Sequence, residues 1–504
     1  MKTKKILSFA LAMLMSVPLF AGCEKQDAPP EPSVTFTDVW TEGVSKTFSA
    51  GESYTVRFDA ALGGQNYIKL EYTSACGLDA TMHFTGEGGK KYSERFFLSK
   101  DDTEFRQILD YYHENNFDKT LESIDFKCVH QSGAFELKKV SAAVHPIDFS
   151  KVNFYAPDYT EENMQLYIHG KTVKLGVNLK LGGAIDYLSS VNQGVALYSD
   201  MGNVYVGQST KDKMYVEDDV NLINAHDTGR LVQQSFYGTK GDSLDEPQDD
   251  YECGLFDHDG NPATPDVAWP YNPVQGGDMY QNLSQLVDVQ FTDTRIYIKV
   301  RPMDWAKSGS ITPFYMENVY EILEDPLYGE YVSVTNKSTD FSGYVHDNVR
   351  DQELPAFYGI TPLGRLAAYK GGEPWTDKSI SYDDNLGFWS PGTSANRFRA
   401  TENWIAWLNE DDWGIGLYVP DVEHMLVGRN EYTVDMSNIG VDPSGAVSCT
   451  YTAPLGKFSM PTYDSFTYRY YLKLDNVTYS RALFQSLREN GAENGDIKKL
   501  EDRA

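Results

Sequence analysis

The sequence predicts a mostly β protein, in which a small jelly-roll-like β-sandwich precedes a large antiparallel β-supersandwich with few helices. Short runs rich in Tyr, Phe, Val and Ile recur along the chain at the spacing of sandwich strands. The 41 Gly and 22 Pro residues suit a chain with many turns between them. Because helical patterns do not alternate with these runs, the sequence argues against a doubly wound sheet or a TIM barrel.

Composition restricts the function classes. The chain has 504 residues, and its hydrophobic share of 41% is enough for a sizeable core. It carries 73 acidic against 44 basic residues, a net charge of -29, so we expect no nucleic-acid partner. The aromatic share of 13% suits both strands and sugar-binding surfaces.

Residues 1–22 have the pattern of a bacterial signal peptide, with a basic start and an apolar run from Ile6 to Leu14. Its end, Phe20-Ala21-Gly22-Cys23, resembles the motif after which a cysteine is lipidated. We therefore expect a lipid at Cys23 and a polar, proline-rich linker over residues 23–33. The protein would sit at the outer membrane or cell surface, touching the membrane through lipid only. The alternative is an ordinary secretory signal cut near Ala21.

Strand-like runs divide the rest of the chain into two parts at a joint near residues 147–151. Residues 34–147 resemble a carbohydrate-binding β-sandwich module, and a structural spacer domain is the alternative. One helix is expected there, capped at Asp101 and with Phe105, Leu109 and Tyr112 on one face. Residues 150–480 hold about eleven strands and form the candidate catalytic lobe. Residues 481–504 continue a helix that starts near Ser480 and end in a charged, loose tail.

Metal and cofactor motifs are weak. Cys76, Cys128, Cys253 and Cys449 have no zinc-type spacing, and a Cys76–Cys128 disulfide and free thiols stay equal alternatives. No serine-hydrolase, zinc-protease or nucleotide-binding motif occurs, so no cofactor is expected. Calcium is a weak candidate ligand for an acidic stretch that departs from the EF-hand pattern and contains Asp257, Asp259 and Asn261. The alternative for this stretch is an ordinary turn.

Polar side chains gather in three segments. The first runs from residue 221 to 237 and holds His226, Asp227, Arg230, Gln234 and Tyr237. A buried strand would not tolerate so many polar groups unless they were paired, so the run suits a polar cleft. A solvated loop before an amphipathic strand is the alternative.

The second segment holds Asn272, Gln275 and Asp278 around two glycines that allow a ligand close to the backbone. In the third, His346 precedes Glu353, which stands directly before an apolar stretch. A carboxylate at such an edge is partly desolvated, and its pKa rises toward that of a general acid. A glycine turn and a surface glutamate are the alternatives for the two segments. Trp375 is the candidate for stacking on a sugar ring.

Several blocks carry a resemblance to known proteins. Lys174–Leu188, with Gly182-Gly183-Ala184-Ile185, and Asn221-Leu222-Ile223-Asn224 look like the opening of galactose-mutarotase-like supersandwich domains. Blocks around Glu353, Trp375 and Trp404 look like secreted bacterial proteins that degrade polysaccharides. Together with the lipidation motif, the chain is similar to surface lipoproteins of glycan-utilisation systems. The resemblance implies work on carbohydrates and does not prove catalysis.

We therefore expect a surface glycoside hydrolase acting on a polysaccharide or oligosaccharide. Asp278 and Glu353 are the expected carboxylate pair, with Asp227 as the reserve; about 5–5.5 Å between them would imply retention and about 6.5–9.5 Å inversion. A polysaccharide lyase, with Arg230 neutralising a uronate and His226, His346 or Tyr237 as the base, is one alternative. A non-catalytic glycan-binding lipoprotein is the other. The expected sugar contacts are His226, Arg230, Gln234, Tyr237, Asn272, Gln275, His346 and Trp375.

Overall fold

The structure is a computed structural model that describes residues 34–109, 119–129, 131–147, 164–191, 195–198, 214–217, 219–238, 255–256, 262–264, 271–346, 348–383, 386, 396–430 and 449–503. Strands make up 55% of it and helices 7%, and its sheets are antiparallel, so the predicted mostly β sandwich class is confirmed. The signal peptide, Cys23, the linker and the calcium candidates Asp257, Asp259 and Asn261 lie outside the described residues.

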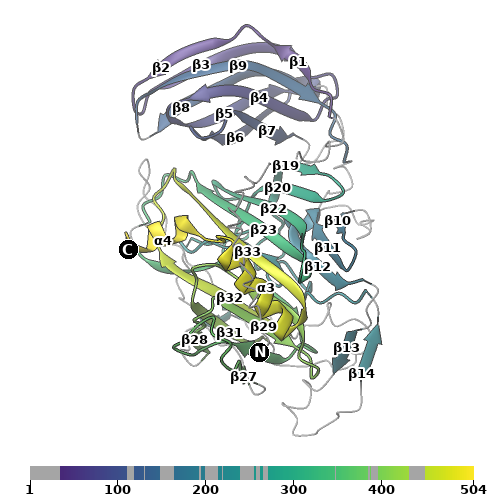
Figure 1. Ribbon diagram of the computed structural model, residues 1–504. Helices are drawn as coiled ribbons and strands as arrows, with labels where there is room; N and C mark the ends of the chain where they lie inside the picture. Colours follow the sequence, from purple (N-terminus) through teal and green to yellow (C-terminus); the bar gives the residue numbers. More distant parts are fainter. Residues whose placement is uncertain are drawn as a thin grey trace, which may run out of the picture.

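The small lobe, purple and blue at the top of Figure 1, consists of a five-stranded and a four-stranded sheet. The five-stranded sheet contains β1 (Thr37–Trp40), β2 (Val44–Phe48), β4 (Tyr67–Ser74), β7 (Glu104–Ile108) and β9 (Gly133–Ala143). The four-stranded sheet contains β3 (Ser53–Ala61), β5 (Gly77–Thr85), β6 (Lys91–Leu98) and β8 (Thr120–Val129). Alternate side chains of these strands are buried, which is the period-two pattern of the sequence.

The predicted helix after Asp101 is wrong, because Glu104–Ile108 is strand β7. β7 pairs with β4 along its full length, and Phe105 stacks on Phe96 at 4.8 Å between ring centroids. Tertiary pairing therefore overrides the helical spacing.

The large lobe contains two nine-stranded sheets, here called the first and the second large sheet. The first contains β10 (Gln165–His169), β11 (Val173–Asn178), β12 (Ala184–Ser190), β15 (Val232–Gln233), β24 (Arg350–Glu353), β25 (Ala356–Ile360), β28 (Arg397–Arg399), β31 (His424–Asn430) and β32 (Cys449–Phe458). The second contains β19 (Gln285–Phe291), β20 (Arg295–Arg301), β22 (Phe314–Asp325), β23 (Gly329–Asp340), β26 (Arg365–Ala368), β27 (Ser381–Asp383), β29 (Trp404–Leu408), β30 (Trp413–Tyr418) and β33 (Ser465–Asn476). One large apolar cluster joins them.

Three short ribbons complete the described part of the large lobe, and helical segments occur in both lobes. The ribbons pair β13 (Val195–Tyr198) with β14 (Met214–Glu217), β16 (Leu255–Phe256) with β17 (Pro262–Thr264), and β18 (Pro273–Val274) with β21 (Met303–Asp304). The helical segments are η1 (Glu87–Gly89) in the small lobe, η4 (Leu179–Leu181), α3 (Val477–Glu489) and α4 (Gly495–Glu501).

The C-terminal tail is more ordered than its charge suggests. The predicted helix lies within α3, which covers β29, β30 and β33 (Figure 1). The expected loose tail is wrong over α4, because Ile497 and Leu500 are buried against the large lobe. Asn494, just before α4, donates from its side chain to the carbonyl of Pro420 at 2.8 Å. The short helix α4 is mostly polar, and its two buried apolar residues attach it to the large lobe.

The two lobes pack against each other through mixed contacts. Val287, Tyr315 and Phe341 of the large lobe belong to the apolar core of the small lobe. The Tyr67 hydroxyl of β4 donates to the buried carboxylate of Asp288 in β19. Among the described strands, β1–β9, which precede the predicted joint, pair only with one another and not with any strand that follows it. Independent folding of residues 152–504 stays a prediction.

Candidate functional site

The first large sheet presents two different faces. Along β15 and the residues after it, Val232 and Phe236 join the large apolar cluster, while Gln234 donates to Asn318 of β22 at 2.8 Å. These three side chains therefore lie between the two large sheets. Ser235 and Tyr237 alternate with them and lie on the opposite face, here called the outer face. The site described next is on this outer face.

A group of hydroxyl-bearing side chains surrounds Glu353 on the outer face. Ser235 donates to Oε2 of Glu353 at 2.9 Å, and the Tyr451 hydroxyl donates to Oε1. Tyr358 and Tyr451 face each other across β25 and β32, with 4.8 Å between ring centroids. We call Glu353, Ser235, Tyr237, Tyr358 and Tyr451 the Glu353 cluster. It joins three strands and the segment after β15, so strand pairing sets its geometry.

Burial changes the acidity of this cluster. Desolvation raises the pKa of Glu353, while hydrogen bonds from Tyr451, Ser235 and Tyr237 lower it by less. Burial, followed by the charge of Glu353, raises the pKa of Tyr237, Tyr358 and Tyr451 well above the usual value for a phenol. The tyrosines thus remain neutral donors, and Glu353 holds a proton at higher pH than an exposed glutamate does.

Asp227 and Arg230 lie beside the cluster. Their segment is attached to β25, since Ile223 bridges to Gly359 and Asn224 donates to the Tyr358 carbonyl at 3.1 Å. Arg230 Nε is 3.5 Å from Asp227 Oδ2, and both side chains are largely shielded from solvent. The Asp227 charge raises the pKa of Tyr358 and the Arg230 charge lowers it. The structure therefore brings Asp227, Arg230, Tyr237 and Glu353 together, four of the predicted site residues.

Asp278 is held by a different set of partners. Its Oδ1 accepts from the backbone N–H of Tyr280 and of Asn282, both at 2.9 Å. Its Oδ2 accepts from the Asn282 side chain at 2.8 Å and from the Gly309 N–H at 2.7 Å. The residue is fully buried. With four donors on two oxygens, this carboxylate organises its loop, and no contact pairs it with Glu353.

Three further predicted sugar contacts lie in the interior. Gln275 accepts from the Gln234 N–H at 3.0 Å and donates to the carbonyl of Gly182, also at 3.0 Å. The Asn272 side chain donates to the carbonyl of Phe236 at 2.9 Å. Gln234, Asn272 and Gln275 are all essentially inaccessible to solvent. Their polar groups satisfy backbone partners between the sheets, so these residues support the outer face from behind.

The remaining candidates are scattered. His346 is buried, stacked on Tyr271 with 5.6 Å between ring centroids, and its Nε2 is 3.4 Å from Asp340 Oδ2. Trp375 is half-buried near α3, where its backbone N–H donates to Glu402 Oε1 at 2.7 Å and its ring packs edge-on against Tyr418. His226 is exposed on the loop before Asp227. His226 directly precedes Asp227, whereas the His346 ring contacts Phe236, the residue between Ser235 and Tyr237, with 5.5 Å between ring centroids.

Sequence reasoning missed Ser235, Tyr358 and Tyr451. Ser235 stands two residues before Tyr237, so period-two alternation was the available signal for it. Tyr358 is five residues after Glu353, an odd spacing, so alternation gives no signal for it. Tyr451 is 98 positions from Glu353 in the chain, and only the pairing of β25 with β32 brings it there.

Neither a metal site nor a membrane-spanning helix is found in the described part of the chain. Groups of three or more His, Cys, Asp or Glu side chains able to hold a metal ion do not occur there. None of its helices is long and apolar enough to cross a membrane. Cys76, Cys128 and Cys449 are buried free thiols, so the disulfide alternative is not what the structure contains.

Comparison with known proteins leaves the family open. A scan against protein-family models gives no match, and a search of curated proteins gives no significant one.

Proposed function

We propose that the protein hydrolyses a glycan at the Glu353 cluster. The observation that carries the proposal is a half-buried glutamate with a raised pKa and hydroxyl donors around it, together with a second carboxylate, Asp227, close enough to act on the same tyrosine. Glycoside hydrolysis needs a carboxyl group that holds its proton until the leaving oxygen takes it. Glu353 has that character, and the half-buried rings of Tyr237 and Tyr358 beside it offer apolar faces to a sugar.

Asp227 is the better partner for Glu353 in this proposal. Both carboxylates act on the same phenol, that of Tyr358, whereas Asp278 spends its oxygens on its own loop. Glu353 donates its proton to the glycosidic oxygen. Asp227, whose Oδ2 lies 3.5 Å from Arg230 Nε, attacks the anomeric carbon or activates a water molecule. Asp278 becomes a structural residue.

The same cluster supports a polysaccharide lyase less well. A lyase needs a base to remove a proton from carbon, and the pKa of Tyr237 is raised far above neutrality by burial and by Glu353. The phenol therefore stays protonated. Arg230, which would neutralise a uronate, is already paired with Asp227.

The setting of the enzyme is part of the proposal. The basic and apolar start followed by Phe20-Ala21-Gly22-Cys23 favours lipid attachment at the outer membrane or cell surface. The net charge of -29 favours a neutral glycan over a polyanion and disfavours nucleic acid. The membrane would be contacted through the lipid only. A Cys23→Ala variant should leave the membrane fraction on cell fractionation.

The test is turnover of a panel of polysaccharides, read as new reducing ends. Glu353→Gln and Asp227→Asn preserve shape and should each lower turnover by roughly 10²–10⁴-fold. NMR of the first product gives the anomeric outcome, and ultraviolet absorbance by an unsaturated product would instead reveal a lyase. Binding without turnover by the wild-type protein, or full activity in both variants, would refute hydrolysis at this cluster.

A further inference from the structure

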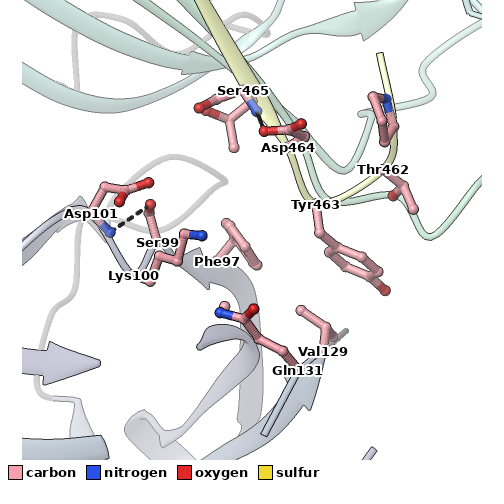
Figure 2. A pocket seen from close by; sticks show the side chains of 13 residues that line it. Phe97, Ser99, Lys100, Asp101, Val129, Gln131, Thr462, Tyr463, Asp464 and Ser465 are labelled. Atoms are coloured by element: carbon pink, nitrogen blue, oxygen red, sulfur yellow. Dashed lines mark hydrogen bonds between the residues drawn. The ribbon is translucent and has the colours of Figure 1, made fainter. Parts of the chain in front are cut away.

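A pocket of about 260 Å³ lies between the two lobes, away from the Glu353 cluster. Figure 2 shows the residues that line it. Phe97, Ser99, Lys100, Asp101 and Gln131 come from the small lobe, and Tyr463, Asp464 and Ser465 come from the turn before β33 and its first residue. Neither lobe makes this pocket by itself.

The aromatic wall of the pocket is held rigidly. Phe97 and Tyr463 lie 6.0 Å apart between ring centroids, one ring from each lobe. Behind them, Phe97 stacks on Phe341 of the large lobe at 5.8 Å with an interplanar angle of 7°. The Phe97 N–H donates to the Tyr315 hydroxyl at 3.1 Å. Phe97 itself is only 5% exposed, so it backs the half-buried Tyr463 ring, which supplies the accessible apolar surface of the pocket.

A salt bridge fixes this contact further. Arg95 makes two hydrogen bonds to Asp79, at 2.9 and 2.7 Å, and a third to the Phe341 carbonyl at 3.1 Å. Such a forked guanidinium–carboxylate contact is geometrically specific. It ties β5 and β6 of the small lobe to the large lobe directly behind the pocket.

Tyr463 itself has a backbone conformation that suggests a requirement for this residue. Its φ is 59°, in the left-handed region that a non-glycine residue rarely occupies. The neighbouring Thr462 hydroxyl accepts from the Gly343 N–H at 2.8 Å and holds the turn. Strain of this kind persists where the surrounding structure enforces it, and it concentrates at binding sites. Here it places an aromatic ring at the mouth of the pocket.

The polar wall carries groups available to a ligand. Asp464 uses Oδ1 to accept from the Ser465 N–H at 2.9 Å, and Ser99 accepts from the Asp101 N–H at 3.1 Å. Lys100, Asp101 and Asp464 are exposed at the edge. One cation and two carboxylates leave little net charge, so they suit neutral hydroxyl groups better than an anion.

We propose that this interlobe pocket is a second glycan-binding site, which takes one neutral sugar unit of an oligosaccharide. The Tyr463 ring, supported from behind by Phe97, packs against the apolar face of the pyranose ring, and Lys100, Asp101 and Asp464 bind its hydroxyls. The proposal rests on the proposed function for its ligand class. It adds that the two lobes bind the oligosaccharide jointly. Neither interpretation of the small lobe, as a carbohydrate-binding module or as a structural spacer, assumes this.

The test is calorimetric titration of the full-length chain with neutral hexasaccharides of the cello, malto, xylo and manno series. The titrations use the Glu353→Gln background, so that no ligand is consumed. Tyr463→Gly removes the ring and suits the positive φ, while Tyr463→Phe retains the ring. We expect Tyr463→Gly to weaken binding of the recognised hexasaccharide about tenfold, and Tyr463→Phe to change it less than about twofold.

The outcomes separate the two proposals. Equal affinity in Tyr463→Gly and the parent, or no hexasaccharide binding at about millimolar concentration, would overturn the interlobe site. Turnover of a short aryl glycoside should be the same in Tyr463→Gly as in wild type, because no residue of the Glu353 cluster lines the interlobe pocket. If Glu353→Gln loses aryl glycoside turnover and Tyr463→Gly retains it, the proposed hydrolysis is supported whatever the calorimetric titration shows.

Discussion

Asp278 and Glu353 are both shielded carboxylates, and they differ in the kind of hydrogen-bond donor that surrounds them. Asp278 accepts from N–H groups of Tyr280, Asn282 and Gly309, and N–H groups only donate. Glu353 accepts hydrogen bonds from the hydroxyls of Ser235 and Tyr451, and a hydroxyl can both donate and accept a hydrogen bond. The environment of Glu353 can therefore stay satisfied with or without its proton, as proton transfer requires. The N–H groups around Asp278 always need a hydrogen-bond acceptor, which is the role of a carboxylate that holds a loop together.

Asp304 is a third case, and it tests the comparison most strongly. Burial raises its pKa to about 7, and the backbone N–H of Asn272 and Ala306 and the charge of Lys307 offset only part of this. Within the described part of the chain, its Oδ2 is buried without a hydrogen-bond partner. The folded protein thus binds this proton more tightly than the unfolded chain does. The resulting stability is present at acidic pH and is lost as the pH rises toward about 7.

The largest effect on stability is expected from Asp304→Asn. The amide imitates the protonated acid, so the variant should unfold with a free energy higher than wild type by up to about 4 kcal/mol at about pH 8. At about pH 4 the two proteins should differ little. Urea unfolding at both pH values measures this. An equal difference at both would show that titration of Asp304 is not the cause.

A smaller effect is expected from Asp278→Ala. The change leaves the N–H groups of Tyr280, Asn282 and Gly309 without their acceptor, which should lower the free energy of unfolding by about 1–3 kcal/mol. Turnover per folded molecule should stay at the wild-type level, in contrast to Glu353→Gln. Chemical unfolding and a polysaccharide assay at matched folded concentration measure the two quantities. A large loss of turnover with an intact fold would return Asp278 to the active site.

The smallest effect sharpens the account of Glu353. Tyr451 donates a hydrogen bond that lowers the pKa of Glu353, so Tyr451→Phe should raise that pKa further. If Glu353 is the general acid, the alkaline limb of the pH–rate profile should move to higher pH by less than about one unit. Tyr358→Phe is the matched control, because hydrogen bonds to Glu353 come from Tyr451, Ser235 and Tyr237. An unmoved limb in Tyr451→Phe would separate the profile from Glu353.

The sequence by itself determined the fold class and most strand positions, because alternation of apolar and polar side chains is a local property. It also indicated Asp227, Arg230, Tyr237 and Glu353, which stand in unusually polar segments or at the edge of an apolar one. The same alternation places Gln234 and Tyr237 on opposite faces of the first large sheet, as the structure shows.

Tertiary structure alone decided the rest. Tyr451 reaches Glu353 through strand pairing across 98 positions, and β7 became a strand because β4 offered it a partner. Asp278 looked catalytic beside its glycines, yet the fold closes a loop of backbone donors around it. The interlobe pocket needs side chains from both lobes. Such outcomes depend on which distant segments meet, and a local pattern holds no information about the partner that a polar group finally obtains.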